Sequence, residues 1–191
     1  MFVDSPMAVN VTDVFEHHLE CLDEETHQLL RGHLNPFNVP GLKLVRTVAE
    51  SKAINRIQGS CIIMAGSGMC TGGRIKQHLI RHLPRPESTV LFAGYQAAGT
   101  LGRQILDGAD EVRIHGETHP VRPRIAQIHG FSAHADRQDL DHWLDGFTAP
   151  PRRVFVTHGE EEASAHLAAR LTEKRGWDVT IPRYRESYSL D

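Results

Sequence analysis

Two histidines follow short apolar runs, at positions where proteins with alternating strands and helices carry reactive side chains. His134 stands in the polar segment 130–136, after the apolar run 125–128, and His158 follows the apolar run 154–156. The loops at strand ends present the chemistry in such folds. An imidazole there can bind a metal or exchange a proton with a substrate. We therefore expect the two imidazoles to serve one site, although a hydrogen-bonded structural histidine explains the spacing of each equally well.

A glycine-rich loop follows the apolar run 61–65 and is the candidate phosphate-binding site. Glycines let the backbone approach an anion, and a helix beginning near Arg74 would direct its N–H groups toward that anion. A tight turn with a purely structural role is the alternative interpretation. The residues expected to bind phosphate are Gly66, Ser67, Gly68, Gly72 and Gly73.

The spacing of these glycines also resembles a loosened dinucleotide fingerprint. A nucleotide- or dinucleotide-binding α/β domain is therefore the second functional hypothesis. That fingerprint expects an acidic residue after the next strand. Here the strand over 90–93 is followed by Gly94, Tyr95 and Gln96, and Glu87 lies before it. The missing carboxylate counts against NAD.

Tyr95 and Arg103 are candidates for contacts with a base or a phosphate, because aromatic rings stack on bases and guanidinium groups pair with phosphates. Burial of the tyrosine ring and an arginine–carboxylate pair explain the same residues without a ligand. Five further basic side chains form either a basic face or ordinary solvated helix charges: Lys52, Arg56, Arg74, Lys76 and Arg81.

Strand, loop and helix alternate through the first half of the chain. The apolar runs 61–65 and 90–93 predict buried strands, and a helix follows each of them. Such units in succession imply right-handed crossovers and a parallel, Rossmann-like sheet with flanking helices. We expect Thr12, Ser51 and Thr100 to cap helices in this half of the chain.

The pattern changes after about Gly108. The segment 112–122 reads as an antiparallel hairpin, and two further strand–helix pairs carry His134 and His158. The helix after His134 is expected to bury Leu140, Leu144 and Phe147. We therefore expect a domain boundary near residue 108, with α/β structure on both sides of it.

The composition excludes several classes of protein. A hydrophobic content of 40% with 24% charged residues is typical of a globular protein, and the net charge of −3 argues against a globally basic nucleic-acid binder. A local basic groove stays compatible with that charge. Three cysteines without a Cys-x-x-Cys pair support neither a disulfide framework nor a cysteine zinc site, which favours a reducing cytoplasm. No apolar run has the length of a membrane span, so we expect no membrane partner.

Several of these segments together resemble the β-CASP branch of the metallo-β-lactamase superfamily, in particular its RNA-processing members. The segments follow in order along the chain: Asp4–Ala8, Gly66–Gly73, Gly94–Arg103, Gly130–Asp136 and Val156–Glu160. The resemblance implies a zinc-dependent ribonuclease that hydrolyses RNA phosphodiester bonds, with two Zn²⁺ ions in the intact enzyme that lower the pKa of a bridging water. It is compatible with a homodimer, which no residue pattern in this chain supports.

The resemblance also assigns roles to residues of the second half. It implies that His158 ligates one zinc and that His134 contacts the scissile phosphate, where it stabilises charge or protonates the leaving oxygen. Ser132 would donate a hydrogen bond to a phosphate oxygen. Asp136 would either orient His134 or cap the helix that follows.

One part of the family's pattern is missing. The His-x-His-x-Asp-His cluster, which holds most of the two-zinc centre with other upstream residues, is absent from the 191 residues. We therefore expect a truncated chain, with 1–108 the latter part of the β-CASP, RNA-clamping domain and 109–191 the C-terminal segment of the metallo-β-lactamase domain. Such a chain would act as an RNA-binding or specificity part and would lack hydrolytic activity with zinc.

Overall fold

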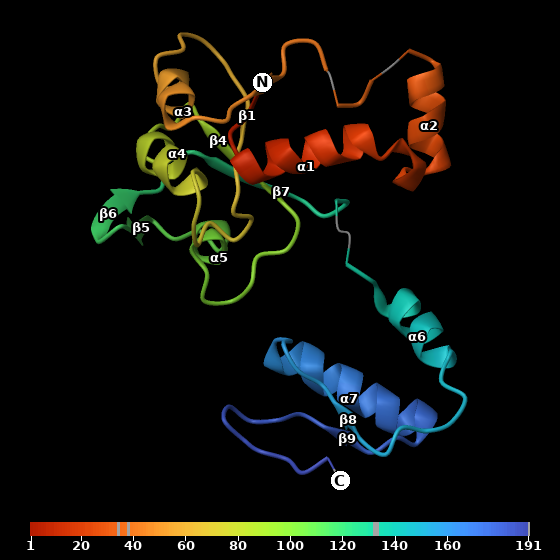
Figure 1. The fold of residues 1–191 in the computed structure, drawn as a ribbon. Coiled ribbons are helices and arrows are strands. Elements are labelled where there is room, and N and C mark those ends of the chain that lie inside the picture. The colour runs from red at the N-terminus through yellow and green to blue at the C-terminus, as the bar shows by residue number, and fades with distance from the viewer. Residues whose placement is uncertain (34, 38, 132–133, 191) are drawn as a thin grey trace. The chain divides into compact units, whose positions relative to one another are not determined.

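The computed structural model describes all residues except 34, 38, 132, 133 and 191. The chain divides into two compact units, Met1–Gly130 (unit 1) and Phe131–Asp191 (unit 2). In Figure 1 the colour of unit 1 runs from red to teal, and that of unit 2 continues from teal to blue.

The first half of unit 1 is mainly helical, with short strands between the helices. Its elements are β1 (Phe2–Val3), α1 (Pro6–His17), η1 (Leu19–Cys21), α2 (Glu24–Arg31), β2 (Lys43–Leu44), α3 (Val48–Ile54) and β3 (Ile63–Met64). Ser5 caps α1, because its hydroxyl accepts a hydrogen bond from the Ala8 N–H at 3.3 Å, and Pro6 occupies the first helical position. The prediction that Thr12 caps this helix is wrong, since Thr12 lies inside it and donates to the Ala8 carbonyl at 3.0 Å.

The cap of α3 also differs from the prediction. Thr47, not Ser51, is the N-cap, and it forms a capping box with Glu50. Ser51 lies inside α3 and points its hydroxyl at a carboxylate 47 residues earlier, that of Asp4. Serine suits both roles, so sequence alone does not separate them.

The second half of unit 1 follows the predicted elements closely. They are α4 (Ile75–His82), β4 (Thr89–Ala93), α5 (Leu101–Leu106), β5 (Glu111–Ile114), β6 (Glu117–Pro120) and β7 (Arg124–Ile128). Thr100 caps α5, with its hydroxyl accepting from the Arg103 N–H at 3.2 Å. β5 and β6 form the predicted antiparallel hairpin. These elements are set by local signals, which is why their prediction succeeds.

The α/β class is confirmed, but the described strands do not form one large parallel sheet. β1 pairs in parallel with β2 and β3, while β4 pairs in parallel with β7 in a separate sheet. The segment 61–65, predicted as a buried strand, pairs over only two residues, and Ile62 is 57% exposed. In β4, Phe92 is buried and Leu91 is 55% exposed, so this strand packs on one face only. An apolar run alone does not tell how much of a strand tertiary packing covers.

The core of unit 1 lies between α4, α5 and the strands β4 and β5. Its buried residues are Cys70, Leu79, Leu83, Phe92, Ile105, Val112 and Ile114. Leu79 of α4 and Leu83, the C-cap residue of this helix, are four positions apart and therefore lie on one helix face. This core fixes the two loops that precede α4 and α5.

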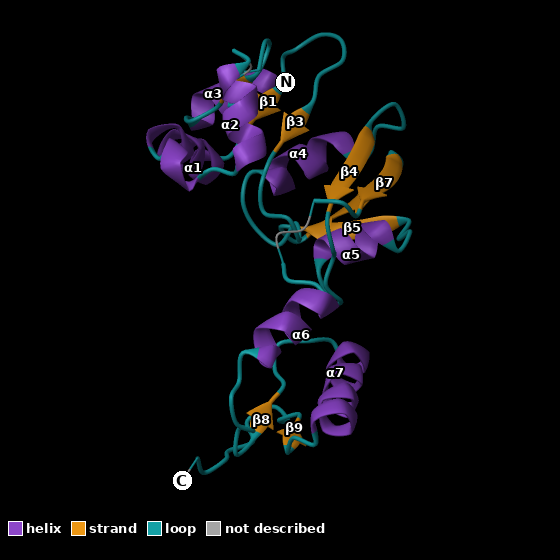
Figure 2. Cartoon of the chain, turned by 90° about the vertical axis from the view of Figure 1, so that its right-hand side faces the viewer, coloured by secondary structure: helices purple, strands orange, loops and turns teal. Residues whose placement is uncertain are grey.

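Unit 2 is smaller and contains α6 (Arg137–Asp145), β8 (Val154–Phe155), α7 (Glu161–Arg175) and β9 (Val179–Thr180). Figure 2 shows α6 and α7 with the short strand pair β8 and β9, which is parallel. Its buried core is Leu144, Val156, Leu171 and Trp177. Of the three residues predicted to face inward from α6, only Leu144 is buried; Leu140 is 36% and Phe147 46% exposed.

Among the residues that the structure describes, none of the helices combines the length and the apolar character that a bilayer crossing requires.

Candidate functional site

The glycine-rich loop before α4 is held mainly by its own backbone. The Cys70 N–H donates to the Ser67 carbonyl at 3.1 Å, and the Ser67 N–H donates to the Gly72 carbonyl at 3.3 Å. The Gly72 N–H donates to the Ser67 hydroxyl at 3.2 Å. Gly73 has a φ of +72°, and a Cβ there would overlap the Gly66 carbonyl oxygen. A side chain at this position would therefore force the loop backbone to shift, and the loop is a tight turn that favours glycine.

The start of α4 is less available to an anion than the sequence suggests. The Ile75 N–H donates to the Gly66 carbonyl at 3.2 Å, and the Gln77 N–H donates to the Arg74 carbonyl at 3.0 Å. Donors that would meet a phosphate are thus used within the protein. The phosphate-binding role of the loop, and of Gly66, Ser67, Gly68, Gly72 and Gly73 in it, stays a prediction.

A second loop, between β4 and α5, interlocks with the first. The side-chain amide of Gln96, 2% exposed, donates to the Gly68 carbonyl and to the Tyr95 carbonyl, both at 3.0 Å. The Gly102 N–H donates to the Met69 carbonyl at 3.1 Å. These hydrogen bonds join residues 66–73 and 94–103 into one surface, which we call the paired loops.

Tyr95 is the aromatic side chain that the paired loops present. It is 57% exposed, so the alternative that its ring is buried is wrong. Arg103 is engaged internally: its Nε lies 2.8 and 2.9 Å from the two carboxylate oxygens of Asp107, and its Nη1 lies 3.4 Å from the Gln96 carbonyl. Arg103 therefore forms an arginine–carboxylate pair, the alternative that explains this residue without a ligand.

β7 ends beside the paired loops. The Gly94 N–H donates to the Ile128 carbonyl at 2.9 Å, and the Gln127 side chain donates to the Gly94 carbonyl at 2.8 Å. Because β4 and β7 are parallel, their carboxyl ends meet at one edge of the sheet. The chain leaves this edge at His129 and continues toward the segment that contains the candidate catalytic residues.

A buried polar cluster lies at the start of α4, next to the glycine-rich loop. The sequence did not predict it. Asp4 is fully buried, and its carboxylate lies 2.5 Å from the Ser51 hydroxyl, 2.6 Å from Arg74 Nη1 and 2.7 Å from His78 Nε2. Arg74 also donates to the Val45 carbonyl at 3.3 Å. We call Asp4, Ser51, Arg74 and His78 the Asp4 cluster. Arg74 is an internal ion-pair partner of Asp4, so neither a basic face nor a solvated helix charge describes it.

The Asp4 carboxylate is held in its ionised form. Burial by itself would raise the pKa of Asp4, but the hydrogen bonds from Ser51, His78 and Arg74, with the charge of Arg74, lower that pKa below its ordinary value of 3.8. The cluster connects β1, α3 and α4. It therefore fixes the position of α4, the helix that directly follows the glycine-rich loop.

The segment before α6 carries the candidate catalytic residues. Ser132 lies outside the described residues, and His134 is exposed. Asp136 caps α6, with its Oδ1 accepting from the N–H groups of Gln138 at 2.7 Å and Asp139 at 3.0 Å. The capping role predicted for Asp136 is thus confirmed.

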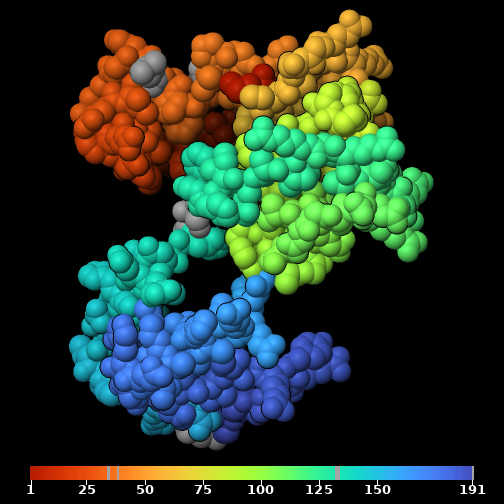
Figure 3. Space-filling view, turned by 180° about the vertical axis from the view of Figure 1, so that it is seen from behind, coloured from red at the N-terminus to blue at the C-terminus, as the bar shows by residue number. Residues whose placement is uncertain are grey.

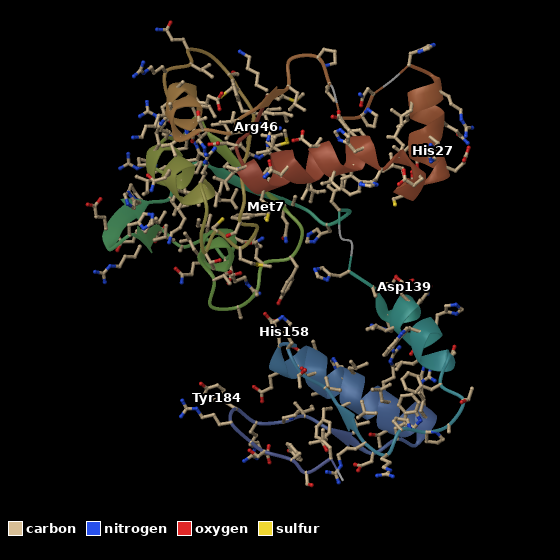
Figure 4. All side chains as sticks on the ribbon, viewed as in Figure 1. Met7, His27, Arg46, Asp139, His158 and Tyr184 are labelled. Carbon is tan, nitrogen blue, oxygen red and sulfur yellow. The ribbon has the colours of Figure 1, made fainter. Side chains whose placement is uncertain are left out.

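His158 lies between β8 and α7 in an unusual backbone conformation. Its φ is +65°, and Figure 4 shows it at the amino-terminal end of α7. A non-glycine residue in this region costs about 1–3 kcal/mol, and such residues concentrate at functional sites. Gly159 follows, and a Cβ there would lie 2.6 Å from the Ser164 hydroxyl. The close approach of Ser164 thus leaves no room for a side chain at position 159.

The described residues do not fit a zinc centre by themselves. Outside positions 34, 38, 132, 133 and 191, no group of three or more His, Cys, Asp or Glu side chains could hold a metal ion. Burial raises the pKa of the Cys70 thiol to about 11, which disfavours the thiolate that zinc requires. One imidazole such as His158 cannot build a tetrahedral shell.

Two family descriptions match the chain. Residues 1–105 match the Beta-Casp domain, and residues 118–182 match the Zn-dependent metallo-hydrolase RNA specificity domain. The second match contains both His134 and His158.

Curated relatives cover the same region. Ribonuclease TTHA0252 of Thermus thermophilus is 38% identical over 97% of this chain and 42% of its own length. Transcription termination factor FttA of Methanosarcina mazei is 31% identical over 88% of the chain and 27% of its own length. An RNase J-like protein of Methanocaldococcus jannaschii is 30% identical over 85% of the chain and 36% of its own length. The chain thus spans less than half the length of these relatives.

Proposed function

Because the chain belongs to the β-CASP branch of the metallo-β-lactamase superfamily, we propose that it is the RNA-binding and specificity part of a zinc-dependent ribonuclease. The intact enzyme would hydrolyse RNA phosphodiester bonds in RNA processing or decay. The observation that supports the RNA-binding role most is the surface of the paired loops, which hold Tyr95 57% exposed on an interlocked backbone. A rigid aromatic side chain is suited to stack on an unpaired base.

The proposed RNA contacts combine stacking with backbone recognition. Tyr95 would stack on a base, and the backbone of the glycine-rich loop would approach the phosphates. Arg103 would offer its guanidinium group to a phosphate in competition with its partner Asp107. Selectivity would come from the shape of the surface and from backbone contacts more than from base reading. The missing acidic residue after β4 argues against the dinucleotide alternative.

For the catalytic step of the intact enzyme we propose roles for three residues of unit 2. His134 would contact the scissile phosphate, Ser132 would donate a hydrogen bond to it, and His158 would supply one nitrogen ligand to zinc. The strained backbone of His158 supports a role other than stability. Because the described donors do not fit a metal centre alone, we propose that this chain by itself does not hydrolyse RNA.

We also propose the domain boundary, the location and the assembly of the protein. A boundary near residue 108, between 1–108 and 109–191, is supported by the ends of the two family matches at 105 and 118. The compact unit extends to Gly130 instead, because β7 pairs with β4. Three free cysteines support a cytoplasmic location, and the homodimer follows from the family resemblance alone.

Two assays test the function. In the first, single-stranded RNA is incubated with the 191-residue protein and zinc, and we expect binding without cleavage. Turnover that disappears in a His134→Ala variant would refute the proposal of an inactive chain. In the second, calorimetric titrations compare single-stranded RNA with NAD, and we expect binding of the RNA alone. Saturable NAD binding at micromolar concentration would favour the dinucleotide-binding domain instead.

A further inference from the structure

The loop that follows β9 presents an exposed tyrosine beside an arginine. Tyr184 is 89% exposed, more than any other large hydrophobic side chain that the structure describes. The guanidinium carbon of Arg185 lies 5.2 Å from the centre of the Tyr184 ring. Figure 3 shows a dark-blue segment of the chain projecting from the rest of unit 2, and Figure 4 shows Tyr184 at the outer end of its loop.

Hydrogen bonds close this turn on both sides. The Glu186 N–H donates to the Arg183 carbonyl at 3.0 Å, and the Arg183 N–H donates to the Glu186 carboxylate at 2.8 Å. The hydrogen bond from the Arg183 backbone, followed by one from the Tyr188 hydroxyl, holds the pKa of Glu186 below its ordinary 4.5. Arg185 has a φ of +64°, which side chains other than glycine rarely adopt. The turn therefore holds Tyr184 and Arg185 in a defined conformation at its tip.

The turn is also anchored to the body of unit 2. The ring of Tyr188 packs edge-on against Phe155 of β8, with ring centres 4.9 Å apart and an angle of 60° between the planes. Tyr188 thus joins the Glu186 carboxylate to the strand that leads to His158. An exposed aromatic residue on an anchored turn loses little conformational freedom when a ligand binds it.

We propose that the Arg183–Glu186 turn is a stacking platform for an unpaired base of single-stranded RNA, an inference that depends on the proposed RNA-binding function. Base stacking on tyrosine and phosphate contact by neighbouring arginines are the chemistry that single-strand binders use. The residues directly before and after Tyr184 are both arginines, whose guanidinium groups can contact the phosphates on either side of a stacked base. The carboxylate of the turn itself is engaged, because Glu186 accepts the hydrogen bond that closes the turn.

Fluorescence anisotropy with a labelled, unstructured RNA tests the platform in the 191-residue protein. We expect Tyr184→Ala to raise the Kd about 5- to 100-fold, which corresponds to the loss of one base stack. Tyr184→Phe keeps the ring and should bind as tightly as the wild type. With the same sequence as a perfect duplex, the bases are not available, and Tyr184→Ala should change nothing. Because Tyr184 is 89% exposed, the thermal midpoint of the variant should equal that of the wild type.

The possible outcomes separate this inference from the function on which it depends. If the wild type binds single-stranded RNA and Tyr184→Ala binds it equally well, the platform is refuted and the proposed function stands. If the wild type does not bind single-stranded RNA, both are refuted. If Tyr184→Ala leaves the RNA affinity unchanged but abolishes self-association in sedimentation, the turn is a protein contact and the platform is likewise refuted.

Discussion

Unit 1 and unit 2 place their charged side chains differently. In unit 1 the Asp4 carboxylate is fully buried, and the Arg74 and His78 side chains that pair with it are 20% and 7% exposed. In unit 2 the ion pairs lie nearer the surface: Arg170 pairs with Asp141 at 2.7 Å with side chains 17% and 33% exposed. Both units have an apolar core, but unit 1 also contains a buried charge, whereas the Arg170–Asp141 pair of unit 2 is partly exposed.

The candidate site residues differ in the same way. The paired loops of unit 1 are tied together through Gln96 and rest on the Asp4 cluster, so their shape depends on the interior. His134 and His158 of unit 2 are exposed on loops at the start of helices. We infer that unit 1 provides a preformed surface, while the histidines of unit 2 require further groups to act.

The two units can be followed separately in one experiment. Both tryptophans of the chain, Trp143 and Trp177, lie in unit 2. Tryptophan fluorescence therefore reports on unit 2, whereas far-ultraviolet circular dichroism reports on both units. A change confined to unit 1 should move the dichroism transition and leave the fluorescence transition in place.

The largest effect is expected from Asp4→Ala. It leaves Arg74 and His78 without their buried partner, and breaking a buried pair costs about 3–5 kcal/mol of the free energy of unfolding. The matched control is Asp13→Ala, because Asp13 pairs with Arg46 at 2.6 Å with both side chains more than 40% exposed; that change should cost about 0–1 kcal/mol. Urea unfolding followed by dichroism measures both. Equal losses of unfolding free energy in the two variants would show that the buried Asp4 cluster stabilises unit 1 no more than an exposed ion pair does.

Acid should reproduce part of the Asp4 effect. Since the folded-state pKa of Asp4 lies below its ordinary 3.8, its ionised form stabilises the fold above pH 3.8. That contribution is lost as the pH falls below 3.8 toward the lowered value. The wild type should therefore lose more stability than Asp4→Asn between neutral pH and this acidic range, measured by dichroism in urea. Identical pH profiles would contradict the depressed pKa.

The glycine-rich loop offers the next comparison. Gly73→Ala introduces a side chain at a φ of +72° against the Gly66 carbonyl, and we expect a loss of about 1–3 kcal/mol. Gly68→Ala is the control in the same loop, because a Cβ there meets no atom within 4 Å. It should change stability by less than about 0.5 kcal/mol. If both variants unfold at the same urea concentration, the conformation of the turn does not require glycine at position 73.

The smallest effect is expected at His158. Replacement by glycine relieves the φ of +65° but gives the unfolded chain more freedom, so the free energy of unfolding of unit 2 should rise by about 1 kcal/mol or less. His166→Gly is the control, because it places the same change inside α7, where glycine costs about 0.5–1 kcal/mol. Tryptophan fluorescence reads both. A larger loss in His158→Gly than in His166→Gly would show that His158 serves the fold.

Local signals allowed much of this fold to be predicted from the sequence. The caps Thr100 and Asp136 and the hairpin of β5 and β6 depend on neighbours within a few residues. The partners of the Asp4 cluster are different, since Ser51, Arg74 and His78 lie 47, 70 and 74 positions from Asp4. Asp4 belongs to the segment Asp4–Ala8, which resembles the β-CASP family. Its neighbours in sequence, however, indicate neither that its carboxylate is buried nor which basic side chain pairs with it.

The candidate site was predictable to a similar degree. The paired loops could be located from their glycines, but the use of their donors within the protein, and the pair of Arg103 with Asp107, emerge only from the packed structure. The positive φ of His158 also has no sequence signal, because histidine, although enriched at positive φ over most residues, adopts that conformation at only a small share of positions. Packing between residues far apart in the sequence determines these features, and the apolar periodicity of the sequence does not predict such packing.

The measurement that tests the central claim most directly is photo-crosslinking of the 191-residue protein to single-stranded RNA that contains 4-thiouridine, followed by mass spectrometry of the peptides. The account predicts crosslinks within the paired loops, at residues 66–73 or 94–103, that unlabelled RNA competes away and NAD does not. Crosslinks that spare both loops, or that NAD displaces, would contradict it.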